Sequence, residues 1–135
     1  MKHSIFINLP VTDLEKSKAF FSALGFTFNP QFTDNTAACL VIDDNIFYML
    51  LTREKFQSFV EGWEISDPKK AIASFNGISV DTREAVDELA DKAIAAGGKE
   101  INEADDEGFM YSRNFSDLDG HVWNIFWMDP SHIQK

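Results

Sequence analysis

The chain has 135 residues, of which 44% are hydrophobic and 25% are charged, as in an ordinary folded domain. Its net charge of −10 argues against nucleic acid and anionic membrane surfaces as partners, because both attract clustered Lys and Arg. The longest apolar runs fall far short of the ~20 residues that a membrane span needs. The N-terminal segment also lacks a signal-peptide pattern, so we expect a cytoplasmic protein.

The first half of the chain predicts a strand, a helix and three further strands. The segment "SIFINLPV" is the first strand, and an apolar stripe at helical spacing predicts a helix over 13–24. Thr12 and Glu15 form a capping-box pair at its start, and Gly25 is a natural stop. Three apolar segments follow between turn residues and predict strands at 26–32, 37–43 and 45–51.

The second half repeats this order. After a strand at 73–80, Asp81 and Glu84 form the cap pair of a helix over 83–96, which a glycine pair ends. Three more strands are predicted at 99–104, 108–115 and 121–128, and the acidic run 103–108 is interpreted as a solvated turn. The predicted fold class is therefore α+β, with two βαβββ modules that form a curved mixed sheet with a concave cleft. One domain (1–135) would hold module 1–51, linker 52–72 and module 73–129.

The linker carries its own apolar residues. The segment "REKFQSFV" predicts a short amphipathic helix, and "SDPKK" predicts an exposed connection. Phe56, Phe59, Val60 and Trp63 are suited to packing between the modules or between subunits, or to covering a sheet edge. We expect a homodimer.

The opening "INLPVTDLEKSKAFFSALGF" and the closing "SDLDGHVWNIFWMDP", together with the repeated module, resemble the vicinal oxygen chelate superfamily. That superfamily includes glyoxalases, extradiol dioxygenases and fosfomycin- and bleomycin-resistance proteins. Within it, the chain looks nearest to the branch of predicted lactoylglutathione lyases. In metal-using members, four His, Gln or Glu side chains from the first and last strands of each module hold a divalent ion. The resemblance places those positions at Phe6, Met49, Phe75 and Asn124.

None of these four side chains is a good ligand for a divalent cation. Phenyl rings do not donate, a thioether prefers soft metals, and a single amide oxygen binds weakly. We therefore predict no cofactor and no metal site. A divalent metal such as zinc or nickel belongs only to the alternative function given below.

The same positions suggest a ligand site lined by apolar and amide groups. Asn124 should face the cleft and orient a ligand by hydrogen bonding, unless neighbouring backbone or water satisfies its amide. Asn8 shares the face of Phe6. Tyr111 and Arg113 lie together in a predicted strand, where Arg113 could meet an anionic ligand or form a salt bridge with a surface carboxylate. The predicted ligand-binding residues are Phe6, Asn8, Met49, Phe75, Tyr111, Arg113 and Asn124.

Three functions remain open at this stage. The first is a glyoxalase- or bleomycin-resistance-like protein that binds a small apolar or aromatic molecule without metal. The alternative is a metal-dependent glyoxalase-like lyase, so enzyme activity stays open. The third is an interaction module whose aromatic residues serve oligomerisation only.

Overall fold

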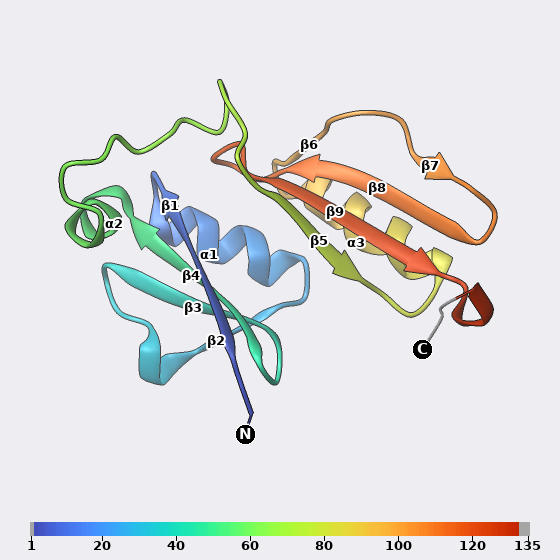
Figure 1. Ribbon diagram of the computed structural model, residues 1–135, viewed down its shortest axis with the longest axis horizontal. Helices are drawn as coiled ribbons and strands as arrows, with labels where there is room; N and C mark the ends of the chain where they lie inside the picture. The colour runs from blue at the N-terminus through green and yellow to red at the C-terminus, as the bar shows by residue number, and fades with distance from the viewer. Residues whose placement is uncertain (1, 133–135) are drawn as a thin grey trace. The chain divides into compact units, whose positions relative to one another are not determined.

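A computed structural model describes residues 2–132, which fall into two compact units that meet in the sequence at Ile65 and Ser66. Each unit contains one βαβββ module, so the predicted α+β fold with two modules is confirmed (Figure 1). The strands are divided between two mixed sheets, one in each unit. The predicted cleft stays a prediction. No helix among residues 2–132 has the length and apolar character needed to cross a membrane.

Unit 1 is a four-stranded sheet with the strand order β1-β4-β3-β2. Strand β1 runs parallel to β4, and the other neighbours are antiparallel. Helix α1 packs on β3 and β4, while the short α2 follows directly after β4, as the linker sequence predicted. The elements are β1 Ile5–Val11, α1 Leu14–Ala23, β2 Thr27–Asn29, a 3-10 helix Pro30–Phe32, β3 Ala37–Asp43, β4 Ile46–Thr52 and α2 Arg53–Phe59.

Unit 2 repeats that topology. Its strand order is β5-β9-β8-β6, with β5 parallel to β9 and an additional short strand, β7, paired with β8. The first strand of each module therefore lies beside the last, which is the internal repeat read from the sequence. The elements are β5 Phe75–Ser79, α3 Arg83–Ala95, β6 Lys99–Glu100, β7 Asp105–Asp106, β8 Met110–Ser116, β9 Val122–Met128 and a 3-10 helix Pro130–His132.

Alternation along the strands separates the two faces of the second sheet. Trp123 and Ile125 are almost fully buried on the face that α3 covers, as the sequence predicted. Asn124 lies between them and points to the opposite face, where its register partner on β8 is Asn114. We call this second surface, which α3 does not cover, the open face of unit 2.

Three local predictions are wrong in their details. Asp13 rather than Thr12 caps α1, because its side chain accepts a hydrogen bond from Lys16 N. Thr82 rather than Asp81 caps α3 in the same way. In addition, the acidic run 103–108 is more than a solvated turn, since part of it forms β7 and pairs with β8.

Replacing Thr82 with alanine should lower the free energy of unfolding by about 1 kcal/mol. The hydroxyl satisfies Ala85 N, which otherwise has no partner within the helix. Asp81→Ala is the matched control, and its loss of a charge near the helix N-terminus should cost only ~0.3–0.5 kcal/mol. Urea unfolding measures both variants, and an Asp81 effect larger than the Thr82 effect would restore Asp81 as the cap.

Candidate functional site

The open face of unit 2 carries a hydrogen-bonded chain of three amides. Asn124 Nδ2 donates to Asn114 Oδ1 at 2.6 Å, and Asn114 Nδ2 donates to Asn102 Oδ1 at 3.0 Å. Register pairing of β8 and β9 places Asn114 opposite Asn124, while Asn102 follows β6. Each amide offers both donors and acceptors, so the chain links three side chains that would otherwise rotate separately.

These amides border a cavity of about 640 Å³, which we call the amide hollow. Phe75 lines it with a ring that is 61% exposed, and Met110 adds a half-buried thioether. Within residues 2–132, no protein group bonds Asn124 Oδ1 or Asn102 Nδ2. The hollow therefore combines an aromatic surface with one unused acceptor and one unused donor.

Acidic side chains line another part of the amide hollow. Glu103 and Asp105 are exposed and line the hollow. A hydrogen bond with Asp105 is the main cause that raises the pKa of nearby Glu107, and the charges of Asp105 and Asp106 add to it. Negative charge is therefore concentrated here, which disfavours anionic ligands and favours ligands that donate hydrogen bonds or carry positive charge.

The predicted site residues of unit 1 lie on neighbouring strands of its own sheet. Phe6 stacks on Phe47 with ring centroids 4.7 Å apart, and Asn8 is the register partner of Met49. Asn8 Nδ2 makes a long hydrogen bond of 3.4 Å to Phe6 O. These residues share one face of β1 and β4, as the sequence predicted. Their combination with Phe75 and Asn124 into one site stays a prediction.

Tyr111 and Arg113 do not belong to the amide hollow. Both lie on the face that α3 covers, where Tyr111 Oη donates to Asp87 Oδ1 at 2.6 Å. Arg113 bonds the carboxylates of Asp87, Asp91 and Glu100 at 2.8–3.2 Å. The salt-bridge interpretation of Arg113 is therefore confirmed, and the two residues are removed from the candidate ligand site because their side chains point toward α3.

Sequence reasoning missed the partners of Asn124. Ser112, Asn114 and Ser116 alternate along β8, and that period of two is the signal of a polar strand face. Asn102 lies beyond the two residues of β6 in irregular backbone, so no periodicity marks it. Instead, its place depends on the hydrogen bond from Ile101 N to Asn114 O.

The residue types at the metal positions do not fit a divalent ion. Phe6 and Phe75 offer no donor atom, Met49 a soft sulfur and Asn124 a single amide. Among residues 2–132, no three or more His, Cys, Asp or Glu side chains gather in a way that could hold a metal ion. The buried thiol of Cys39 is also unsuited to this role, because burial raises its pKa and keeps it protonated.

Two βαβββ modules with parallel first and last strands define the architecture of glyoxalase-like proteins, and the comparisons agree with it. A family model described as "Bleomycin resistance protein-like N-terminal" matches residues 3–43. Hypothetical protein SA1046 from S. aureus is 32% identical over 94% of this chain and 95% of its own, with a TM-score of 0.77. No curated protein sequence matches the chain.

More distant structures share the fold. A glyoxalase/bleomycin resistance protein/dioxygenase family enzyme from Burkholderia phytofirmans is 23% identical, covering 91% of this chain and 96% of its own, with a TM-score of 0.76. The fosfomycin resistance protein FosX from Listeria monocytogenes is 16% identical, covering 97% of each chain, with a TM-score of 0.67. The fold is therefore that of the glyoxalase/bleomycin resistance/dioxygenase structures, and residues 3–43 are similar to the bleomycin resistance protein-like N-terminal family.

Proposed function

We propose that this protein binds a small planar or apolar molecule in the amide hollow and does so without a resident metal. The observation that carries the proposal is the amide chain beside the exposed ring of Phe75. The ring offers a stacking surface, and Asn124 Oδ1 offers a hydrogen-bond acceptor in a direction fixed by Asn114. Such a combination of apolar contact and a few fixed polar groups is typical of small-molecule sites.

The charges of the hollow narrow the class of ligand. Glu103 and Asp105 line it, whereas none of the lining residues carries a positive charge. A neutral or cationic ring with N–H donors can pair with Asn124 Oδ1 and gains from the negative field. An anionic ring of the same shape meets unfavourable charge.

The proposed absence of a metal is supported by the donor chemistry of the four family positions. Burying a divalent ion against Phe6 and Phe75 would leave its charge without compensating ligands. The alternative, a metal-dependent glyoxalase-like lyase, is supported by resemblance to the superfamily alone. Homodimer formation and a cytoplasmic location also stay predictions. The exposed side chains of Phe59 (63%) and Trp63 (76%) in and after α2 support a dimer.

Three probes of one shape and different charge test the proposal: benzamidine, benzamide and benzoate. Two-dimensional ¹H–¹⁵N NMR titrations should show saturable shifts at Phe75, Asn114 and Asn124 with benzamidine, weaker ones with benzamide and none with benzoate. In Asn114→Ala, the benzamidine Kd should rise about tenfold, since Asn124 loses its orienting partner. Asn45→Ala, an amide in the β3–β4 turn of unit 1, is the matched control and should leave that Kd unchanged.

Elemental analysis of the purified protein tests the metal-free part separately. We expect far less than one equivalent of zinc, nickel or manganese, and no change in the benzamidine Kd after chelation. Stoichiometric metal, or isomerisation of the methylglyoxal–glutathione adduct, would replace this proposal with the lyase. Equal binding of benzoate and benzamidine would also contradict the proposal, because the charges of Glu103 and Asp105 would then have no effect on binding.

A further inference from the structure

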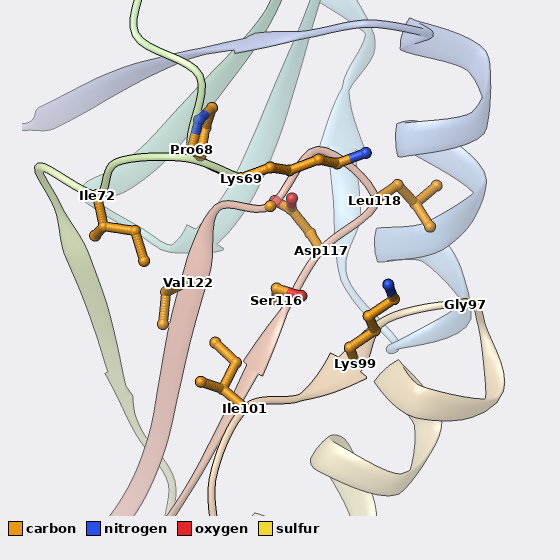
Figure 2. Close-up of a pocket in the computed structure, with 11 residues that line it drawn as sticks. Pro68, Lys69, Ile72, Gly97, Lys99, Ile101, Ser116, Asp117, Leu118 and Val122 are labelled. Carbon is orange, nitrogen blue, oxygen red and sulfur yellow. The ribbon is translucent and has the colours of Figure 1, made fainter.

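A second cavity of unit 2 has the opposite charge character. It has a volume of about 410 Å³ and is lined by Lys69 and Lys99 together with apolar side chains (Figure 2). We call it the lysine hollow. It shares no lining residue with the amide hollow. Its volume falls near the small end of the roughly 300–1,000 Å³ that ligand sites occupy.

The apolar part of the lysine hollow contains side chains that water still reaches. Ile72 is 57% exposed and Ile101 is 47% exposed, whereas Val122 is buried. In the view of Figure 2, these three side chains gather on one side of the hollow, and both lysine side chains extend toward Leu118 on the other. A ligand that fits this arrangement has an apolar body and one polar end.

Both lysines are free to meet a ligand. Within residues 2–132, neither ammonium group takes part in an ion pair, although the chain carries a net charge of −10. Lys99 is placed by pairing of β6 with β8, where it lies opposite Ser116. Lys99 and Glu100 are consecutive in β6, so their side chains point to opposite faces of the sheet. The Glu100 carboxylate bonds Arg113 on the face away from Lys99.

Lys69 is placed by a close approach of two backbone segments. Gly120 has φ +93°, and a Cβ atom added to it would lie 2.7 Å from Lys69 Cγ and 3.1 Å from Lys69 N. Only a glycine therefore allows the linker segment to rest on the loop between β8 and β9. Asp67 Oδ1 also accepts a hydrogen bond from Lys69 N at 3.0 Å, so the start of this side chain is held on both sides.

One acidic residue lines the hollow, but its carboxylate is already occupied. Asp117 Oδ1 accepts from Asp119 N and His121 N, and Oδ2 accepts from Trp123 Nε1, each at 3.0 Å. The residue is only 7% exposed. Two ammonium groups and one buried carboxylate leave a net charge of +1 at the hollow, which suits a ligand with one negative charge.

We propose that the lysine hollow binds a small monoanion with an apolar body, such as an aryl- or branched-alkyl carboxylate, between Lys69 and Lys99. The carboxylate would accept hydrogen bonds from the two ammonium groups, while the apolar body covers Ile72, Ile101 and Val122. This site is independent of the proposed function, because the amide hollow favours neutral or cationic molecules and uses different residues.

The test uses 3-phenylpropionate, with 3-phenylpropionamide as its uncharged counterpart. In ¹H–¹⁵N NMR titrations of the full chain, the acid should cause saturable shifts at Lys69, Lys99, Ser116 and Val122, and the amide should not. Lys69→Gln and Lys99→Gln should each raise the Kd about three- to fivefold, as expected for exposed charge pairs. Lys70→Gln, the neighbouring lysine outside the hollow, is the control and should leave the Kd unchanged.

A pair of glycine variants tests the placement of Lys69. Gly120→Ala displaces the Lys69 backbone and should weaken binding, whereas Gly62→Ala introduces a comparable positive-φ strain at φ +84° with nothing within 4 Å. Asn114→Ala should not affect this probe, which separates a failure here from a failure of the proposed function. Equal binding of acid and amide, an equal effect of Lys70→Gln, or no saturable shift would overturn the proposal.

Discussion

Replacing Arg113 with methionine should lower the free energy of unfolding by about 1–3 kcal/mol, because it removes several charged hydrogen bonds whose carboxylate partners are partly screened by solvent. The Arg113 side chain is only 11% exposed and bonds carboxylates from α3 and β6. Its pKa is raised above the ordinary value, first by hydrogen bonding to Glu100 and then by bonds to Asp91 and Asp87. Without the guanidinium, these three carboxylates would repel one another across the contact between the helix and the sheet.

Lys92→Met is the matched control for this prediction. Lys92 pairs with Glu88 one turn away on the same helix at 3.3 Å, and both side chains are well exposed. Its loss should cost only about 0.3–0.5 kcal/mol. Urea unfolding of both variants measures the difference. A similar small effect for Arg113 would mean that its network stabilises the fold no more than an ordinary surface pair does.

The sequence predicted the order of elements because each element has a local signal. The run "AACLVID" predicts β3 with its observed bounds, and Gly25 and Gly97, with φ of +100° and +109°, follow the ends of α1 and α3. The caps were assigned one residue too early because two adjacent residues can cap at each site. Thr12 and Asp13 both have suitable side chains, so the backbone angles decide between them.

Strand β7 could not be found in this way. Asp105 and Asp106 have low strand propensity, and only tertiary contacts hold them in place. Asp106 forms an ion pair with Arg83, whose guanidinium also lies 4.7 Å from the centroid of the Tyr111 ring. The bond to Arg83 is the main cause that lowers the pKa of Asp106. These partners are distant in the sequence, so no window of neighbouring residues reveals the strand.

The candidate site was predicted only where strand alternation determines it. Alternation placed Asn124 opposite to Trp123 and Ile125, and the structure confirms this placement. Alternation also put Tyr111 and Arg113 on one face, but it could not identify that face as the one covered by α3. The lysine hollow was missed because Lys69 lies in the linker and meets Lys99 only through the fold.

The second large effect is expected at Asp117, in the loop before β9. Asp117→Ala should lower the free energy of unfolding by about 2–4 kcal/mol, since three N–H groups lose a carboxylate acceptor in a buried place. Trp123→Phe removes the Nε1 donor and also puts a smaller ring in a fully buried place, so it should cost about 2–4 kcal/mol. The double variant should lose about 1 kcal/mol less unfolding free energy than the sum of the two single losses. Both substitutions remove the same hydrogen bond, so its contribution is lost only once.

Asp117 should also make stability depend on pH. Burial is the main cause that raises its pKa above the ordinary 3.8, while the positive charge of His121 and the hydrogen bond from Trp123 oppose the rise. The folded chain therefore keeps this proton to higher pH than the unfolded chain. The stability due to protonated Asp117 is fully present below the unfolded pKa and is lost as pH rises through the folded pKa.

Asp117→Asn removes this titration and provides the comparison. As the pH rises from below the ordinary value of 3.8 through the raised pKa of the folded state, wild-type stability should fall relative to that of the variant, and the difference should become constant once Asp117 is ionised in both states. Urea unfolding across this range measures the difference. A wild-type protein that gains stability over Asp117→Asn as pH rises would show the opposite sign, and the N–H donors around the carboxylate would then outweigh its burial.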